Sequence, residues 1–188
     1  MIGASMAERY VADSTSMTSL PQDEILPAAA DLFKAGMRRL TGGVAIVTAR
    51  GDDGSWLGMT VTSVCSLTAE PPMLLVCANK AGSFGGHARR GMPFCVNLLS
   101  AENEEVARAC AGMIGQSREH RFGGKNWRTG ADGTPILSTA LARFHCVIAD
   151  LISASTHLLT IGRVWDVHLS NGGAAALAYR EGQFIKVQ

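Results

Sequence analysis

Hydroxyl side chains are concentrated in residues 58–66, which read Gly-Met-Thr-Val-Thr-Ser-Val-Cys-Ser. In an extended chain successive side chains point to opposite faces, so Thr60 and Thr62 share one face, opposite Met59 and Val61. One face can then pack on a core while the other offers hydroxyl and backbone groups to a polar, planar ligand. The same pattern is typical of a strand that runs into a turn rich in serine and threonine, and the stretch alone favours that simpler interpretation.

Two further segments carry groups that could hold a phosphate. In the loop 79–83, Asn79, Lys80 and Ser83 combine a lysine, a hydroxyl and the expected start of a helix. A solvated loop is the simpler alternative there. Residues 118–122, Arg-Glu-His-Arg-Phe, could place a cation over the phosphates of a dinucleotide or form a charged surface turn, and both alternatives stay open.

His157 stands at the head of an apolar strand, directly after Ser-Ala-Ser-Thr. Imidazole can donate or accept a hydrogen bond near neutral pH, because its reference pKa is about 6.5. A capped or surface histidine is the commoner role at such a place. The other histidines show no mutual spacing for a metal, so no metal site is expected. The sequence contains no Gly-x-Gly-x-x-Gly after a strand, no phosphate-binding Walker loop, no His-Glu-x-x-His and no Gly-x-Ser-x-Gly.

The bulk properties are those of one globular domain. The chain has 188 residues, 47% of them hydrophobic, and a formal net charge of +1. This charge offers no general attraction for nucleic acid or anionic membrane, and no apolar run approaches the roughly 20 residues of a membrane span. The five cysteines are odd in number and widely spaced, and we interpret them as reduced core residues. We expect a cytoplasmic protein with a flexible N-terminal arm (1–25) and one domain (26–188).

The elements that must position these groups follow from periodicity and turn residues. Six or seven strands with three inserted helices, mostly antiparallel by loop length, predict a mainly β fold and a closed or nearly closed barrel. The expected helices cover residues 28–40, 83–90 and 100–111. The expected strands cover residues 44–49, 56–62, 73–78, 94–98, 142–148 and 157–167, followed by a terminal hairpin at 179–184.

The order of these segments resembles the short-chain flavin reductases, the reductase components of two-component, flavin-diffusible monooxygenases. The resemblance rests on residues 33–48, on 58–66 with Pro71-Pro72, on Asn79-Lys80 with Ser83, on 94–99, on Arg121-Phe122 and on the strand from His157 to Val164. It covers about residues 32–187. It implies an FMN-binding split β-barrel of antiparallel, Greek-key type, which forms a homodimer with flavin near the subunit interface.

The resemblance also implies an activity, its cofactors and its partner. Members of this family reduce FAD or FMN with NADH or NADPH and release the reduced flavin to a partner monooxygenase. By position, the isoalloxazine and ribityl chain would be lined by Gly58, Met59, Thr60, Val61, Thr62, Ser63 and Ser66. The flavin phosphate would be approached by Asn79, Lys80 and Ser83. Arg121 and Phe122 would lie near the cofactor tail or the nicotinamide nucleotide, and His157, the catalytic candidate, would face the nicotinamide.

Two departures from the family pattern and two rival functions accompany this interpretation. Ser155-Thr156-His157 replaces the usual Gly-Asp-His, which removes an acidic neighbour that could raise the pKa of the histidine. Gly42-Gly43-Val44 stands where the family often has Thr-Gly-Val. A non-enzymatic flavin- or haem-binding barrel is the main rival. An oligonucleotide-binding barrel is poorly supported, because only 6% of residues are aromatic.

Overall fold

The structure is a computed structural model that describes residues 26–114, 117 and 121–188. The expected arm, residues 1–25, lies outside these. The chain divides into two compact units, residues 1–36 and 37–188. The helices are α1 (Ala30–Arg38), the 3₁₀ helix η3 (Ala101–Asn103) and α2 (Glu104–Cys110), and the strands are β1 (Gly42–Gly43), β2 (Ala45–Arg50), β3 (Trp56–Val61), β4 (Val64–Ala69), β5 (Pro72–Asn79), β6 (Pro93–Leu98), β7 (Trp127–Thr129), β8 (Pro135–Leu137), β9 (Ala142–Ala154), β10 (His157–Leu169), β11 (Ala176–Arg180) and β12 (Gln183–Val187).

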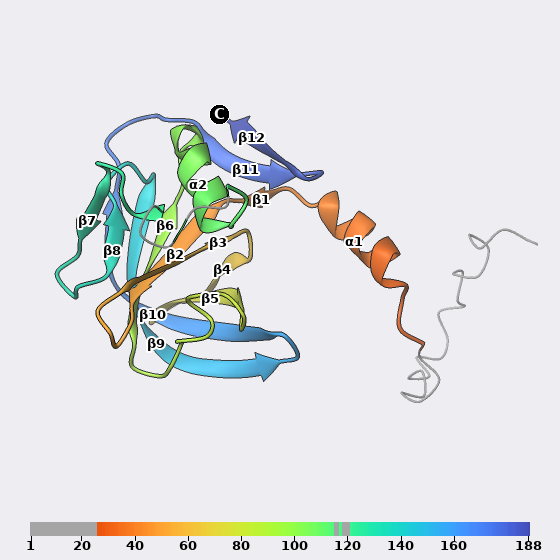
Figure 1. Ribbon diagram of the computed structural model, residues 1–188, viewed down its shortest axis with the longest axis horizontal. Coiled ribbons are helices and arrows are strands. Elements are labelled where there is room, and N and C mark those ends of the chain that lie inside the picture. Colours follow the sequence, from red (N-terminus) through yellow and green to blue (C-terminus); the bar gives the residue numbers. More distant parts are fainter. Residues whose placement is uncertain (1–25, 115–116, 118–120) are drawn as a thin grey trace, which may run out of the picture. The chain divides into compact units, whose positions relative to one another are not determined.

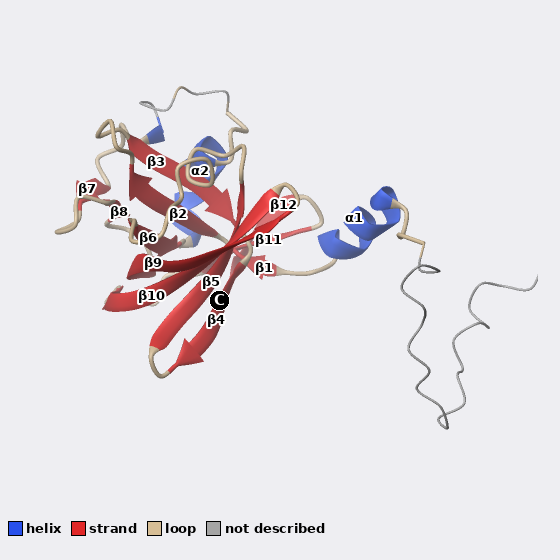
Figure 2. Cartoon of the chain, turned by 90° about the horizontal axis from the view of Figure 1, so that it is seen from below, coloured by secondary structure: helices blue, strands red, loops and turns tan. Residues whose placement is uncertain are grey.

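One antiparallel sheet of seven strands forms the body of the second unit. Its strand order is β3-β2-β6-β9-β10-β5-β4, and the long β9–β10 hairpin is paired between β6 and β5 (Figures 1 and 2). The mainly β, antiparallel expectation is therefore confirmed. The expected closure of a barrel is not observed, because β3 and β4 form the two edges and no ladder joins them within the described residues. The sheet does curl, and the Cys77 N–H of β5 donates to Ser63 O, between β3 and β4.

Strand β2 is buried on both faces, and Thr48 is the one polar residue of its buried part. Ala45, Val47 and Ala49 belong to the core enclosed by the curled sheet, where Phe84 and Phe94 also pack. Ile46 belongs to a second core with residues of α2 and β8. Helix α2 packs against β2 and β3 (Figure 1). A strand that is buried on both faces reads as a mostly apolar run, and here Thr48 alone interrupts it.

Buried polar groups fix the small β7–β8 hairpin onto the sheet. The Asn97 side chain accepts a hydrogen bond from Leu137 N at 2.9 Å, and its amide donates to Ile46 O and to Thr48 Oγ1. Thr48 Oγ1 in turn donates to Pro135 O at 2.5 Å. Because each of these buried groups has a partner, the network holds the hairpin in one position at low cost.

Several expected elements differ from the observed ones. The short helix predicted for residues 83–90 is absent, and residues 84–87 form turns. The glycines at 85 and 86 lower the helix propensity of this segment, and a Cβ at Gly85 would stand 2.1 Å from Asn79 O, so the turn there requires glycine. The helix predicted for 100–111 is divided into η3 and α2. Strands β1, β4, β7 and β8 were not predicted, whereas the terminal hairpin was, with Gly182 in its turn at a φ of 80°.

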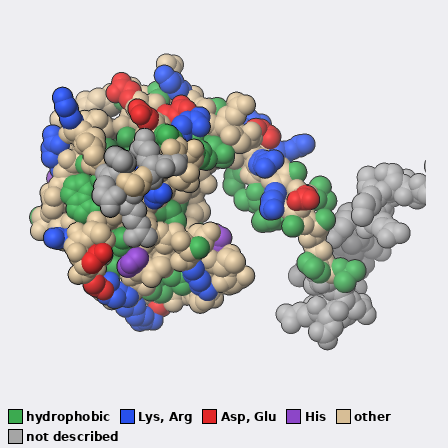
Figure 3. All heavy atoms as spheres, in the orientation of Figure 1, with side chains coloured by type: hydrophobic (Ala, Val, Ile, Leu, Met, Phe, Trp, Pro, Cys, Tyr) green, Lys and Arg blue, Asp and Glu red, His purple; other side chains and the backbone are tan. Residues whose placement is uncertain are grey.

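The surface carries both signs of charge. Figure 3 shows lysine and arginine side chains interspersed with acidic ones over one face of the second unit. This distribution agrees with the near-neutral net charge of +1. Among the described helices, none has both the length and the apolar character that a membrane span requires.

Candidate active site

A polar cleft of about 520 Å³ opens beside the β3 edge of the sheet. Its volume lies within the range of about 300–1,000 Å³ that is usual for small-molecule sites. Its walls come from β3, from the loop after β5, from the end of α2 and from the segment before β7. The lining residues are Gly58, Met59, Thr60, Asn79, Ala81, Gly82, Ser83, Cys110, Ala111, Gly112 and Arg121.

Two hydroxyl groups of the cleft are bound to the backbone. Ser83 Oγ donates to Gly58 O at 2.9 Å and accepts from Gly58 N at 3.3 Å. Thr60 Oγ1 donates to Ala107 O at 2.7 Å and so ties β3 to α2. Since Gly58 turns its N–H and C=O away from β2, alternation along the strand turns those of Thr60 the same way. Edge strand β3 therefore presents backbone groups on the cleft side.

The loop after β5 begins with a side-chain turn. Asn79 Oδ1 accepts from Ala81 N at 2.9 Å. This leaves the Asn79 amide group as a donor at the rim of the cleft, with no partner among the described residues. A Cβ at Gly82 would stand 3.0 Å from Met59 Sδ, so glycine lets this loop approach β3 closely.

Arg121 is the one charged side chain among the described residues that line the cleft. Its Nε is buried and has no hydrogen-bond partner in the described part of the chain. A Cβ built on Gly112 would stand 3.9 Å from Arg121 Nη2, so the guanidinium lies at the C-terminal end of α2, where the helix dipole favours a cation. Arg121 also borders a neighbouring cleft of about 370 Å³.

Phe122 supports this arrangement from outside the cleft. Its ring lies over β3, where a Cβ at Gly58 would stand 2.7 Å from Phe122 Cζ. The ring is held between two tryptophans, with centroid distances of 5.4 Å to Trp56 and 4.9 Å to Trp127. Trp127 Nε1 also donates to Arg121 O at 3.1 Å. The aromatic cluster thus fixes the backbone from which Arg121 extends.

The end of α2 is the part of the cleft that the sequence analysis missed. Burial raises the pKa of the Cys110 thiol to about 12, and the nearby charge of Arg121 opposes this only in part. Cys110 is therefore a neutral thiol and not a nucleophile. Gly112, with a φ of 74°, ends the helix. A glycine after a helical run was the one available signal, and it marks the end of a helix without indicating what that end faces.

The structure brings together six of the predicted site residues: Gly58, Met59, Thr60, Asn79, Ser83 and Arg121. Others from the hydroxyl-rich stretch lie elsewhere. Val61 is buried in the core, Thr62 is exposed, and Ser63 Oγ donates to Cys77 O at 3.0 Å. Ser66 belongs to β4, at the opposite edge of the sheet.

Lys80 and His157 lie next to each other, outside the residues that line the cleft. His157 begins β10 and pairs with Asn79 of β5, and its Nδ1 is 2.9 Å from Thr156 Oγ1. Lys80 Nζ donates to Ser153 Oγ at 2.7 Å and to Ser155 O at 2.6 Å. The lysine therefore holds the β9–β10 turn in this structure. Of the basic segment 118–122, residues 118–120 lie outside the described residues.

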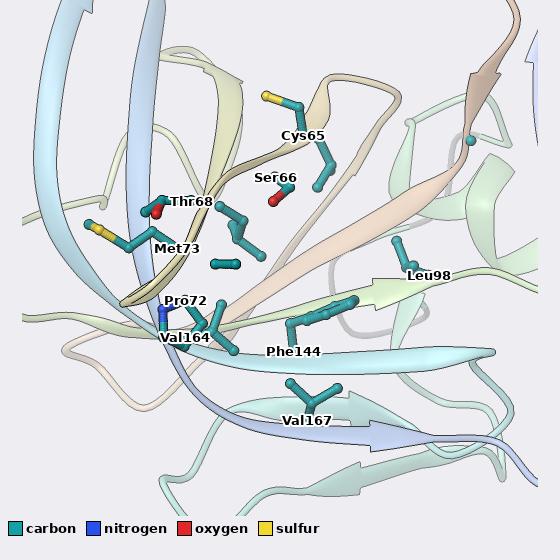
Figure 4. Close-up of a pocket in the computed structure, with 13 residues that line it drawn as sticks. Cys65, Ser66, Thr68, Pro72, Met73, Leu98, Phe144, Val164 and Val167 are labelled. Atoms are coloured by element: carbon teal, nitrogen blue, oxygen red, sulfur yellow. The ribbon is translucent and has the colours of Figure 1, made fainter.

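A second, apolar pocket of about 440 Å³ opens inside the curl of the sheet, between β4–β5 and the strands β9 and β10. Phe144, Val164 and Val167 form one wall, and Ser66 lies across from them with Cys65 and Met73 (Figure 4). Val167 is 44% exposed, and Leu67 and Leu169, on the same strands, are 49% and 73% exposed. This surface is more apolar than a solvated sheet face requires.

Comparison with known proteins gives one consistent result. The family model described as "Flavin reductase like domain" matches residues 37–188. The reductase component of 4-hydroxyphenylacetate 3-monooxygenase from Pseudomonas aeruginosa is 35% identical over 156 residues, which are 83% of this chain and 91% of that protein. The FMN reductase (NADH) RutF of Yersinia enterocolitica is 38% identical over 148 residues, 74% of this chain and 79% of that protein.

Solved structures agree with these sequence matches. BorF, the flavin reductase component of a bacterial two-component tryptophan halogenase, superimposes with a TM-score of 0.75 at 29% identity, covering 85% of this chain and 98% of that one. The flavin reductase HpaC, solved in complex with NADP⁺, gives a TM-score of 0.73 at 28% identity, with the same two coverages of 85% and 98%.

Proposed function

The chain belongs to the family of flavin reductase-like domains, and from that premise we propose that it transfers a hydride from NADH or NADPH to FAD or FMN in the polar cleft beside β3. The reduced flavin is then released to a partner monooxygenase. The observation that carries the proposal is the set of donors in the cleft, above all the buried Arg121 Nε, which has no hydrogen-bond partner among the residues that the structure describes.

The residues of the cleft fit a flavin. Arg121, the Asn79 amide and the Thr60 N–H are donors, and no carboxylate occurs among the described residues that line the cleft. Such a set of donors favours an electron-rich or anionic ligand, because no negatively charged side chain of the set repels it. When bound, the flavin and the nicotinamide supply the redox chemistry themselves, so the protein needs no strong acid or base.

The chain's own contribution is binding and orientation. The donors along the β3 edge would hold the edge of the ring system on which negative charge develops, and fixed donors stabilise such charge without reorganisation. Arg121 would bind a phosphate or this same edge. His157 and Lys80, at the start of β10 and the end of β5, would meet the nicotinamide nucleotide at the rim. Holding two reactants at contact distance accounts for much of the rate enhancement expected of such a site.

A turnover matrix tests this function. Purified protein is assayed for oxidation of NADH and NADPH, each with FAD, with FMN and without added flavin. We expect flavin-dependent oxidation in at least one combination, with a rate that saturates as free flavin is added. Passing the protein through a desalting column beforehand distinguishes diffusing flavin from tightly held flavin, because only the former leaves the activity dependent on added flavin.

The rival function, a non-enzymatic flavin- or haem-binding protein, would give a different result in the same matrix. Flavin or haem would bind, as shown by a change in visible absorbance, but no combination of nicotinamide and flavin would turn over. That outcome would overturn the proposed activity and leave a binding function.

The proposed partner and assembly follow from the same premise. A flavin-dependent monooxygenase would consume the reduced flavin, as in the two-component systems that give the relatives their names. The apolar pocket inside the curl of the sheet, where Val167 is exposed, would be covered by a second copy of the chain. Analytical ultracentrifugation should then show a dimer, and Val167→Lys should shift it toward monomer. A monomer at micromolar concentration would exclude this homodimer.

A further inference from the structure

Two histidines and an aspartate meet outside the cleft, on the β9–β10 hairpin. His145 lies on β9, and Asp166 and His168 lie on β10. Each residue offers one possible ligand atom, and these three atoms all lie within 4.8 Å of one another. His168 Nε2 and Asp166 Oδ2 are 3.1 Å apart. Their sequence positions show no metal spacing, because a whole hairpin separates His145 from the other two.

A β-bulge creates this cluster. The register runs from Val164 opposite Cys146 to Asp166 opposite His145, so Trp165 is the extra residue. A bulge of this kind changes which face the following side chains take. Without it, Asp166 would pair with Phe144 and face the core. With it, Asp166 and His168 share the face of His145, while Val167 pairs with Phe144.

His145 is buried and its Nδ1 lacks a partner. The side chain is 5% exposed, and neither His145 Nδ1 nor Asp132 Oδ2 has a hydrogen bond within the described residues, although the two atoms are only 3.9 Å apart. The other oxygen of Asp132 is satisfied, since it accepts from Thr134 N and Thr134 Oγ1. Two unpartnered buried polar atoms that face each other call for an explanation.

A metal ion on the other ring nitrogen of His145 would account for an Nδ1 that faces the Asp132 carboxylate. A histidine that ligates a metal through one ring nitrogen almost always donates its other N–H to a carboxylate or carbonyl. Asp132 is placed for this role by the β7–β8 hairpin, which the Asn97 and Thr48 hydrogen bonds fix onto the sheet. The Asp132–His145 pair then has the arrangement of an outer carboxylate behind a ligating imidazole.

We propose that His145, Asp166 and His168 bind a divalent transition-metal ion of the Zn²⁺ type, with Asp132 orienting His145. Imidazole with one carboxylate suits Zn²⁺ and its neighbours and not Mg²⁺ or Ca²⁺. In a tetrahedral site with bonds of about 2.0–2.1 Å, ligand atoms lie about 3.3 Å apart. The Asp166 and His168 side chains are 42% and 54% exposed, so they can move the short distance needed.

Charge and location complete the description of the site. Arg143 pairs with His168 and so lies on the same face, and the carboxylates of Asp132 and Asp166 offset the two positive charges of the ion. Three protein ligands leave the fourth position to water. None of these residues lines the cleft beside β3. The proposal therefore does not depend on the proposed function, and the ion would stabilise the β9–β10 hairpin.

Isothermal titration of the full chain, without an affinity tag, with ZnCl₂ tests the site. We expect one Zn²⁺ per chain and no heat of binding with MgCl₂. Asp166→Asn and His168→Ala change exposed side chains and should leave the fold intact, as circular dichroism would verify. Each should weaken Zn²⁺ binding at least tenfold, and Asp132→Asn should weaken it about 10- to 100-fold.

His87→Ala is the matched control, because His87 is an exposed histidine outside the cluster. This variant should bind Zn²⁺ as the unchanged chain does. Co²⁺ gives an independent readout, since Trp165 lies 5.3 Å from the His145 ring and its emission should be quenched by the bound ion. Trp165→Phe should remove that quenching. Absence of Zn²⁺ binding, or binding that survives both Asp166→Asn and His168→Ala unchanged, would overturn the proposal.

Discussion

Arg121 is a charged, partly buried side chain of the cleft, and its Nε has no hydrogen-bond partner in the described part of the chain. We predict that Arg121→Gln weakens flavin binding about tenfold or more, because hydrogen bonds to charged groups contribute about 1.5–3 kcal/mol. Fluorescence titration with FAD and FMN measures the change. Arg128→Gln is the control, since Arg128 is exposed on β7 and its guanidinium donates to Lys125 O and Trp127 O. Equal flavin affinity in both variants would remove Arg121 from the binding site.

His157 lies beside Asn79 at the rim, and Thr156 is its one side-chain partner among the described residues. We predict that His157→Ala raises the KM for NADH or NADPH about two- to tenfold, the effect of one neutral hydrogen bond. Flavin affinity should stay the same, because the residue does not line the cleft. Steady-state kinetics with varied nicotinamide measure this change. Unchanged kinetics would exclude His157 from the site.

At the scale of elements, β10 can cross the core only because Gly162 has no side chain. A Cβ there would stand 2.4 Å from Phe94 Cζ and 3.3 Å from Cys146 Cβ. Phe94 is fully buried and has no room to move. We predict that Gly162→Ala lowers the free energy of unfolding by about 1–3 kcal/mol, as overpacked cores do.

Urea unfolding monitored by circular dichroism measures the effect of Gly162→Ala. Gly172→Ala is the control, because a Cβ at Gly172 would have nothing within 4 Å. A Gly162→Ala variant as stable as the control would mean that Phe94 can repack. Hydride-transfer activity is not needed for this comparison, so it is independent of the proposed function.

The whole molecule keeps three of its cysteines neutral. Burial raises the pKa of Cys110 and of Cys146 to about 12, and that of Cys95 further. Cys65 is exposed. We predict that Cys95, Cys110 and Cys146 react with a disulfide reagent such as DTNB at pH 8 only on unfolding. Rapid reaction of these three in the native protein would contradict this.

The same thiols make stability depend on pH. Their folded pKa values lie above the unfolded value of about 8.5, so the folded state binds more protons at alkaline pH. The contribution is therefore fully present below about pH 8.5 and is lost as pH rises toward 12. We predict a falling urea midpoint between pH 8 and pH 10. Cys146→Ala should flatten this fall, whereas Cys65→Ser should not.

The six predicted residues that line the cleft came from the family resemblance, whereas periodicity and turn residues by themselves determined the mainly β class and the first and last hairpins. These features depend on residues close in sequence, so the local alternation of apolar and polar residues is enough to predict them. Which hydroxyls share the cleft was decided by the tertiary structure, because a break at Thr62-Ser63 sends Ser66 to the opposite edge of the sheet. The end of α2 and the His145–Asp166–His168 cluster also required it. Their residues meet through long-range strand pairing and one bulge. A bulge moves the following side chains to the other face of the sheet, and the local spacing of residues does not predict this.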